Sequence, residues 1–169
     1  VFRYNESAGI SSLDPAFARS QSNIWAVNQL FNGLVQMDNN LRIQPAIARS
    51  WQIGDSGRTY TFKLRRNIYF HKDACFGADS TRIVLASDFE YSFRRLVSSK
   101  IASPGAWVFK NVKSFEALND STLEIRLQKA FSPFLGILSM KYCSVVPREA
   151  VELYGKDFSR NPFGTGIRA

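Results

Sequence analysis

The alternation of apolar and polar residues in Thr59–Arg65 constrains the fold more than any other stretch of this sequence. Tyr60, Phe62 and Leu64 point to one side of an extended chain, whereas threonine, lysine and arginine side chains point to the other. This period of two is typical of a β-strand with one face in a core and one in water. The chain must therefore also provide partner strands and an apolar layer that covers the buried face.

A hairpin farther along the chain provides partner strands. The runs "VKSFEAL" and "TLEIRL" are joined by the turn Asn119-Asp120-Ser121, with Leu123, Ile125 and Leu127 on the inward side. "VFRY" at the start and "CSVV" at residues 143–146 are predicted as further short strands.

Ser87–Ser98 is the clearest helix. Ser87 and Glu90 form an S-x-x-E capping box, in which each side chain can satisfy an orphan backbone N–H of the other. The helix carries an apolar stripe of four residues: Phe89, Phe93, Leu96 and Val97.

Three further helices are predicted. One begins at Ser22 and stops near Gly33, with one apolar side made of Ile24, Val27, Phe31 and Leu34. A short helix starts at Ser132-Pro133, and the last one runs from Pro147 to Gly155. Residues 71–82 and 98–105 are expected to be irregular. The pattern indicates an α+β fold with a mixed sheet and packed helices, because strands and helices do not alternate regularly.

The net charge of +8 favours acidic partners such as nucleic acid or phospholipid headgroups. The basic residues are dispersed, however, and the longest basic cluster is only Lys63, Arg65 and Arg66. We therefore expect no nucleic-acid partner. A basic module for nucleic acid or anionic membrane stays open as an alternative function.

The sequence offers little for a metal site. Two cysteines and one histidine fall short of the roughly four ligands of a zinc site, so we expect no metal and no cofactor. Cys75 and Cys143 could form a disulfide in an oxidising compartment, but the sequence does not place them together. Cys143 lies in an apolar run and is expected to be a buried thiol. No apolar stretch approaches the roughly 20 residues of a membrane-spanning helix. No signal peptide precedes Val1, so we expect any targeting segment to have been removed.

Catalytic motifs are weak. His71 is the only histidine and would have to serve any Ser-His-Asp arrangement, yet no G-x-S-x-G elbow is present. A hydrogen-bonded structural role is the expectation for His71, and a hydrolase remains the enzymatic alternative. The closing Gly-Thr-Gly lacks the Lys-Ser/Thr of a phosphate-binding loop. Trp107, in the irregular "SPGAWVF", could display its ring to a ligand or plug the edge of the core.

Seven motifs in register resemble the N-terminal part of the family 5 extracellular solute-binding proteins, the oligopeptide, dipeptide and nickel receptors of bacterial ABC importers. They are "SLDP", "LFNGLVQMD", "PAIARSWQIGDSGRTYTFKLRRNIYFH", "ASDFEYSFRRL", "TLEIRL", "VVPREAVELYG" and "NPFGTG". The sequence departs from the family in the longer, cysteine-containing "HKDACFGADSTRIVLASDF", where the family has a short His-Asp-Gly turn. It also departs in "GTGIRA", where the family continues Gly-Thr-Gly-Pro.

The resemblance implies part of a two-lobed, type II-like periplasmic-binding-protein fold. Residues 1–40 would start the large lobe, residues 41–162 would form a small accessory subdomain, and residues 163–169 would cross back to the large lobe. Because family members are much larger, we expect this chain to be a truncated portion. We expect a monomeric, non-enzymatic, periplasmic or cell-envelope receptor, lipid-anchored in some members, which delivers a peptide or similar solute to membrane permease subunits.

The resemblance also implies ligand-binding residues. The loop after the first strand contributes Gly9, Ile10 and Ser11 to the interlobe cleft, and the segment matching "SPGAW" contributes Gly105 and Trp107. Lys141 and Tyr142 are expected at the rim. Peptide-binding relatives often have an acidic residue at about the position of Gly9, so the glycine argues against a contact to a peptide terminus.

Overall fold

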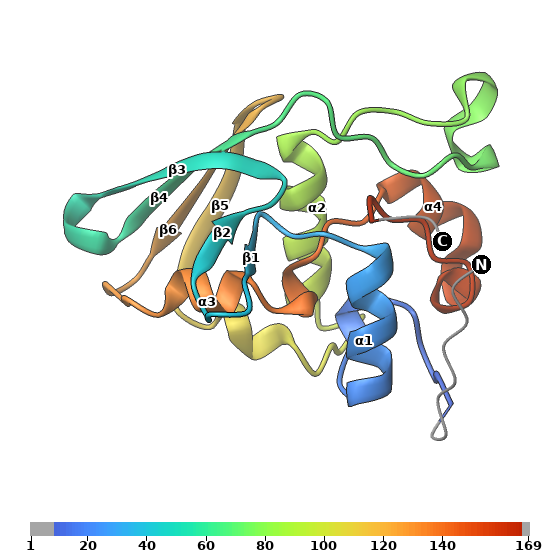
Figure 1. The fold of residues 1–169 in the computed structure, drawn as a ribbon, viewed down its shortest axis with the longest axis horizontal. Coiled ribbons are helices and arrows are strands. Elements are labelled where there is room, and N and C mark those ends of the chain that lie inside the picture. Colours follow the sequence, from blue (N-terminus) through green and yellow to red (C-terminus); the bar gives the residue numbers. More distant parts are fainter. Residues whose placement is uncertain (1–8, 167–169) are drawn as a thin grey trace.

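The computed structural model describes residues 9–166, and its largest element is a four-stranded antiparallel sheet (Figure 1). The spatial order of the strands is β3 (Ala48–Gly54), β4 (Thr59–Leu64), β6 (Thr122–Leu127) and β5 (Val112–Asn119). A separate hairpin pairs β1 (Val35–Met37) with β2 (Ile43–Pro45). The strand predicted for "VFRY" lies outside the described residues.

Helices and short 3-10 segments, joined by loops, accompany the strands in the described chain. The α-helices are α1 (Gln21–Leu30), α2 (Ala86–Val97), α3 (Phe134–Leu138) and α4 (Arg148–Tyr154). The 3-10 segments are η1 (Pro15–Phe17), η2 (Asp55–Gly57), η3 (Ala74–Asp79), η4 (Ala106–Phe109), η5 (Lys141–Cys143) and η6 (Gly155–Ser159). The predicted α+β class is confirmed, but every pair of these strands is antiparallel, so the sheet is not mixed within residues 9–166.

The alternation predicted for β4 is confirmed, and its apolar face is buried in the main core. All three inward residues of β4 are buried, as are Leu123, Ile125 and Leu127 of β6. Helix α2 packs on β5 and β6 and stands beside β5 in Figure 1. Phe93 is the centre of this contact, with ring centroids 4.6 Å from Phe109 and 5.7 Å from Phe115. Burial of such a ring stabilises the fold by about 1.5–3 kcal/mol.

The start of α2 differs from the prediction. The helix begins at Ala86, one residue before the expected cap, and Ser87 is exposed. The carboxylate of Asp88 accepts the Leu85 N–H at 2.8 Å instead. Glu90 accepts the Ala117 N–H of β5 at 2.9 Å, so its carboxylate ties the helix to the sheet. The predicted stripe is correct except for Val97, which is 43% exposed.

Helix α1 also begins earlier than predicted, since Ser20 is its cap and accepts the Asn23 N–H. It ends at Leu30, three residues before Gly33, and Ile24 is partly exposed rather than part of a buried stripe. Its buried side joins a second apolar cluster with α4 and η6. That cluster contains Ala18, Val27, Phe31, Val146, Ala150 and Phe158.

The strand predicted at "CSVV" is wrong, although the burial is right. All four residues are buried, but Cys143 is the last residue of η5, and residues 144–146 continue outside both sheets with an extended backbone at Ser144. The Val145 N–H donates to the Asn32 carbonyl, and the Val146 N–H donates to the hydroxyl of Ser92. Such isolated bonds satisfy the buried backbone without a ladder. The predicted helix from Pro147 to Gly155 is confirmed as α4, whereas α3 follows Pro133 with no cap bond from Ser132.

Residues 164–166 lie against the end of α1. The Gly166 N–H donates to the Leu30 carbonyl at 2.9 Å, and a Cβ on Gly164 would lie 1.9 Å from that same carbonyl oxygen. His71 holds the segment from the other side. Its backbone N–H donates to the Gly164 carbonyl, and its ring Nε2 lies 2.5 Å from the Gly166 carbonyl oxygen. The structural role predicted for His71 is confirmed. The glycines are needed for close backbone approach rather than for a turn.

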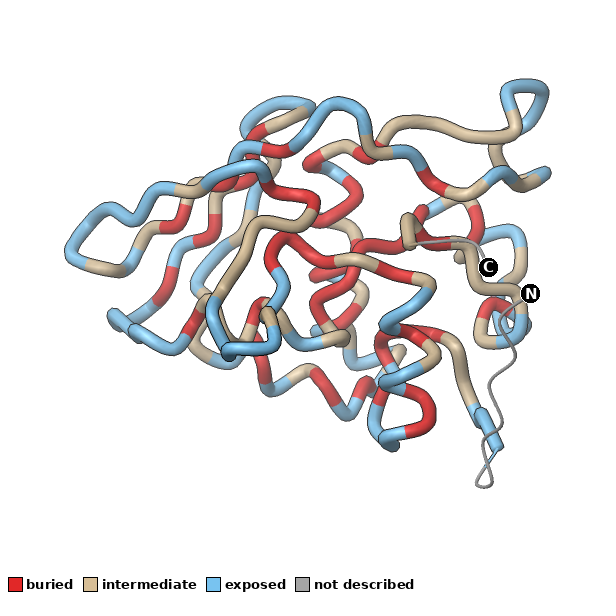
Figure 2. The backbone as a smooth tube through the Cα atoms, viewed as in Figure 1, coloured by how far each residue is buried: buried red, intermediate tan, exposed pale blue. Residues whose placement is uncertain are grey.

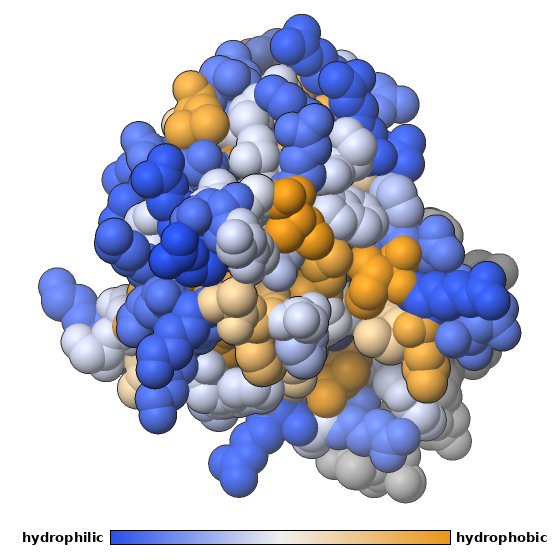
Figure 3. Space-filling view, turned by 90° about the vertical axis from the view of Figure 1, so that its left-hand side faces the viewer, coloured by the Kyte–Doolittle hydropathy of each residue, from blue (hydrophilic) through white to orange (hydrophobic). Residues whose placement is uncertain are grey.

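Burial follows the inner sheet face and the helices, while the β3–β4 turn is exposed (Figure 2). The face seen from the side of that turn is hydrophilic around its edges, and hydrophobic side chains gather across its middle (Figure 3). Within residues 9–166, no helix is long and apolar enough to cross a membrane. Cys75 and Cys143 are both free thiols, and Cys143 is buried as predicted. The domain boundaries at residues 40 and 162 stay predictions.

Candidate ligand-binding surface

Three segments that are distant in the sequence meet on one side of the molecule: η1 with the loop before it, residues 102–107, and η5. Segment η1 packs against η5. The hydroxyl of Ser103 donates to the Ala16 carbonyl of η1 at 2.5 Å and accepts the Gly105 N–H at 3.0 Å. A single buried serine therefore fixes the loop after α2 onto η1.

A buried ion pair fixes η1 to α2. The Asp14 carboxylate accepts the Ala16 N–H at 3.0 Å, which caps η1. It also accepts two N–H groups of Arg95, at 2.9 and 2.5 Å. Both side chains are nearly inaccessible, so loss of one partner would leave a buried charge and cost about 3–5 kcal/mol.

Asn23, in the first turn of α1, holds the predicted cleft loop. Its side-chain oxygen accepts the Ser11 N–H at 3.1 Å, and its amide nitrogen donates to the Ser11 hydroxyl at 3.0 Å. Asn23 is buried, whereas Ser11 is exposed. The backbone at residue 11 is therefore fixed while its outer side stays accessible.

A hollow of 670 Å³ opens between this loop and the segment after α2. Its lining combines serine, asparagine and arginine side chains with one aromatic ring, one alanine and one proline. The lining residues are Ser11, Ser12, Phe17, Arg19, Ser20, Asn23, Ala102 and Pro104. The volume falls in the range of about 300–1,000 Å³ that is usual for ligand pockets. Of the residues predicted for the site, only Ser11 lines it.

Arg19 and Asn23 were not among the residues predicted for the site. A usable signal was present, because Ser20 with Asn23 three residues later marks a serine cap and hence the true start of α1. That boundary would have placed Arg19 and Asn23 beside the predicted loop.

Gly105 and Tyr142 are brought into direct contact. A Cβ on Gly105 would lie only 2.3 Å from Cδ1 of the Tyr142 ring, so the backbone at residue 105 lies on the ring. Gly105 is buried and Tyr142 is partly buried. Gly105 is thus a packing residue that sets the position of η4.

The side chain of Trp107 is exposed at the surface and does not fill the edge of the core. It lies in η4 and is 54% exposed, whereas the next two residues, Val108 and Phe109, are buried in the main core. The buried pair anchors the short helix, and this leaves the indole ring at the surface. A rigidly mounted, exposed indole is suited to contact with a ligand.

Lys141 lies in η5 next to Tyr142 and is partly buried. Desolvation lowers the pKa of its ammonium from the ordinary value of 10.5. A partly desolvated cation gains from a nearby anion, because the anion restores the favourable energy lost with water. Gly9 and Ile10 are both exposed, and Gly9 adopts a positive φ of 68° that suits glycine.

The described residues contain no group of three or more histidine, cysteine or acidic side chains arranged to hold a metal ion. Nor does His71 have a free ring for catalysis at Nε2, because the nitrogen that faces the Gly166 carbonyl must donate its proton there.

Residues 42–167 match the family model described as bacterial extracellular solute-binding proteins, family 5 Middle. Among curated proteins, the chain is similar to the glutathione-binding protein GsiB. It is 28% identical to the one from Salmonella choleraesuis and 29% identical to the one from Escherichia coli O157:H7, over 94% of this chain and 30% of each relative. The chain therefore spans about a third of the length of these relatives.

Solved structures give the same relationship. Listeria monocytogenes OppA bound to peptide matches with a TM-score of 0.87 and 25% identity, over 95% of this chain and 34% of that one. Helicobacter pylori DppA in complex with the peptide STSA matches with a TM-score of 0.80 and 30% identity, over 93% and 34%. Campylobacter jejuni NikZ in complex with Ni(L-His) matches with a TM-score of 0.78 and 30% identity, over 94% of this chain and 30% of that one. By fold and by sequence, the chain belongs to the bacterial extracellular solute-binding proteins of family 5.

Proposed function

We propose that this chain is part of the substrate-binding component of an ABC importer, which captures a peptide or similar small solute and delivers it to a membrane permease. The observation that carries this proposal is the convergence of Ser11, Pro104 and Trp107 with η5 on one side of the molecule. Each is held by buried contacts yet presents groups to the outside. Family membership supports solute binding rather than catalysis.

We place the ligand between this surface and a further part of the protein that larger relatives have. The relatives include a glutathione-binding protein and structures with bound peptide or with Ni(L-His). The bound molecules named in these relatives are small peptides or an amino-acid complex. Lobe closure would then exclude water from the solute. The proposed location is the periplasm or cell envelope, with or without a lipid anchor, and the proposed state is a monomer.

The expected ligand has an anionic group toward Lys141 and an extended backbone along residues 9–11. The partly desolvated ammonium of Lys141 favours a carboxylate. Exposed backbone beside Ser11 can bond a peptide main chain, as in other peptide-binding clefts. Trp107 would contact a side chain or the peptide plane.

The test is an NMR titration of the 169-residue chain with tri- and tetrapeptides. We expect weak, millimolar binding, because the chain alone offers one wall of the cleft. Shifts should be confined to Ser11, Gly105, the Trp107 indole N–H and η5. Trp107→Ala should remove them, while Trp51→Ala, a change of the same kind in β3, should not.

Two results would contradict the proposal. Absence of shifts at these residues with saturating peptide would exclude them from the binding surface. Micromolar peptide binding measured by calorimetry would show that these residues form a complete site, contrary to the one-wall arrangement.

A further inference from the structure

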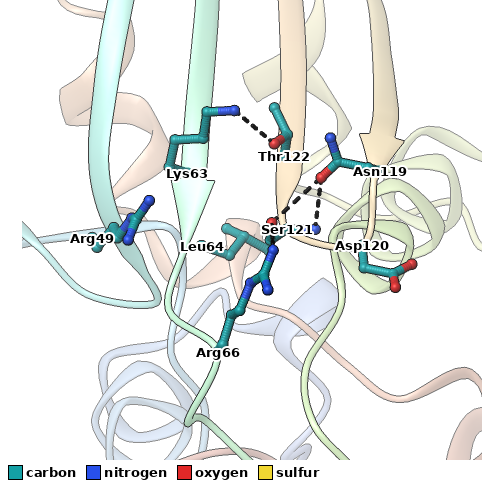
Figure 4. A pocket seen from close by; sticks show the side chains of 8 residues that line it. All are labelled: Arg49, Lys63, Leu64, Arg66, Asn119, Asp120, Ser121 and Thr122. Atoms are coloured by element: carbon teal, nitrogen blue, oxygen red, sulfur yellow. Dashed lines mark hydrogen bonds between the residues drawn. The ribbon is translucent and has the colours of Figure 1, made fainter.

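A second hollow, at one end of the four-stranded sheet, gathers three basic side chains (Figure 4). Arg49 comes from the start of β3, Lys63 from the end of β4, and Arg66 from just beyond β4. The β5–β6 turn closes the other side. The lining of this 650 Å³ hollow consists of Arg49, Lys63, Leu64, Arg66, Asn119, Asp120, Ser121 and Thr122.

A β-bulge directs Arg49 to this place. Ala48 pairs with Leu64 and Ser50 pairs with Lys63, so Arg49 is an extra residue in β3. Bulges redirect a side chain and often occur beside functional sites. A second irregularity lies between Ala117 and Asn119 in β5, at the same end of the sheet. Both irregularities therefore flank the basic hollow.

The three cations are not neutralised by carboxylates. Elsewhere in residues 9–166, six arginines form ion pairs with acidic side chains, and none of the three cations is among them. Lys63 donates to the Thr122 hydroxyl at 2.9 Å, and Arg66 approaches the Ser121 hydroxyl at 3.5 Å. Asp120 is the one acidic lining residue, and its carboxylate is turned away from the cations in Figure 4.

We propose that this hollow binds a phosphate-type oxyanion, either free phosphate or the phosphate of a lipid headgroup. Guanidinium groups present forked N–H donors that match phosphate oxygens, and a lysine adds a compact charge. Three like charges around one hollow repel each other, so a bound dianion also relieves that repulsion. The hydroxyls of Ser121 and Thr122 add neutral hydrogen-bonding groups at the closed side.

This site is independent of the proposed solute capture. Its lining shares no residue with the hollow beside Ser11. Failure of one proposal therefore leaves the other intact, and each is tested with different variants.

The first experiment titrates the chain with inorganic phosphate at low ionic strength and follows backbone and guanidinium NMR signals. The test variant is Arg49→Gln with Arg66→Gln. The matched control is Arg42→Gln with Arg160→Gln, which removes the same charge from two exposed arginines elsewhere. We expect saturable shifts around residues 49, 63–66 and 119–122. The test variant should bind at least tenfold more weakly, and the control should change less than twofold.

The second experiment identifies the source of the phosphate. Vesicles of phosphatidylcholine with about one third phosphatidylglycerol are compared with pure phosphatidylcholine in a sedimentation assay. Sedimentation with anionic vesicles that the test variant loses indicates a lipid headgroup. Saturable phosphate binding without sedimentation indicates the free anion. Both results support the oxyanion site.

Two results would overturn it. One is equal weakening in the test and control variants, since that reports net charge rather than a site. The other is a wild-type chain without saturable shifts that also fails to sediment with anionic vesicles. Circular dichroism of both variants confirms that they fold, as expected for changes at exposed residues.

Discussion

Several glycines of this protein are placed by contact rather than by an unusual backbone angle. Gly105 has a φ of −89°, which any residue can adopt, yet a side chain there would overlap the Tyr142 ring. Gly164 and Gly166 leave room for the carbonyls of Leu30 and Gln29 in the same way. At these positions a substitution acts through steric overlap, so the loss of stability depends on how far the neighbouring group can move.

Gly105→Ala is expected to destabilise the chain by about 1–3 kcal/mol, the usual range for overpacking. The added methyl lies 2.3 Å from a ring carbon, so the ring of Tyr142 or the backbone of η4 must shift. Urea unfolding measures the change. The control is Gly136→Ala in α3, where a Cβ meets nothing within 4 Å, and it should be neutral or stabilising. Equal effects of the two changes would disprove the contact.

Glu149 gives an acid-dependent contribution to stability. Hydrogen bonds from Arg82, at 2.6 and 2.7 Å, lower the pKa of this carboxyl below its ordinary value of 4.5. Because the folded-state pKa is below the unfolded one, the stabilisation is complete above the unfolded-state pKa of about 4.5. It is lost as the pH falls through the folded-state pKa.

Glu149→Gln should therefore reduce the loss of unfolding free energy between about pH 5 and pH 3, which is roughly the range in which carboxyl groups titrate. Arg82 keeps its pair with Asp88, so the variant should fold. Denaturant midpoints at several pH values measure the effect. Glu152→Gln, which changes an exposed pair with Arg148, should leave the pH profile close to that of the wild type. A Glu149→Gln profile identical to the wild type would refute the assignment.

At the scale of elements, α2 connects most parts of the described fold. Its inner face covers the sheet through Phe89, Phe93 and Leu96. Asp88 at its start bonds Arg82, which also reaches Glu149 of α4. Arg95 in its last turn holds Asp14 beside η1. Helix α2 therefore joins the sheet to the surface that carries the candidate site.

The position of the helix start can be tested with two alanine variants. Ser87→Ala should change stability by less than about 0.5 kcal/mol, because the side chain is exposed and is not the cap. Asp88→Ala should cost about 2–4 kcal/mol, because the Leu85 N–H and the Arg82 guanidinium both lose a partner. Thermal and urea unfolding give the comparison. A larger loss of stability for Ser87→Ala than for Asp88→Ala would instead support the predicted S-x-x-E capping box.

At the scale of the whole molecule, the described chain has two apolar clusters of unequal size. The larger one lies between the sheet and α2 and extends to β1 and η5. The smaller one has six buried members from α1, α4, η6 and their flanks. Several large apolar side chains near the candidate surface remain exposed, including Ile10, Phe17 and Trp107.

Hydrogen exchange should separate the two clusters. Amides of β4, β6 and α2 are expected to exchange most slowly, because the larger cluster must open for their exchange. Amides of α1 and α4 should exchange faster, since fewer buried side chains hold these helices. Mass spectrometry of peptides from timed exchange measures both. Equal protection of α1 and β4 would indicate one cooperative unit instead.

The sequence predicted this protein best where a local period settled the structure. Residues such as Phe62 and Ile125 are buried because alternation and apolar character both act within a few positions. The start of α2 was less well predicted, because Ser87 is a good cap by type. The helix instead begins one residue earlier, and Asp88 in its first turn accepts the Leu85 N–H. The "CSVV" segment is apolar enough for a strand, but no strand lies beside it to form a ladder.

For the candidate surface, the sequence supplied residues but not their neighbours. Ser11, Gly105 and Tyr142 were predicted, and the structure brings Gly105 against Tyr142 and Ser11 into one hollow with Pro104. Arg19 and Asn23 could be assigned to the candidate surface only once the structure showed where α1 begins. Whether all seven predicted residues contact a ligand remains a prediction.

By itself, the sequence determined the class of the fold and its buried strand faces, because these depend on residue type and short-range spacing. Its motifs also carried the resemblance to the family. Only the tertiary structure decided which distant residues meet. The basic residues looked dispersed along the chain, yet strand pairing and a bulge bring Arg49 beside Lys63 and Arg66. Likewise, Gly164 and Gly166 are required because a Cβ there would lie 1.9 Å from the Leu30 carbonyl oxygen or 2.1 Å from that of Gln29. Contacts of this kind depend on how the sheet and helices pack, which no local pattern contains.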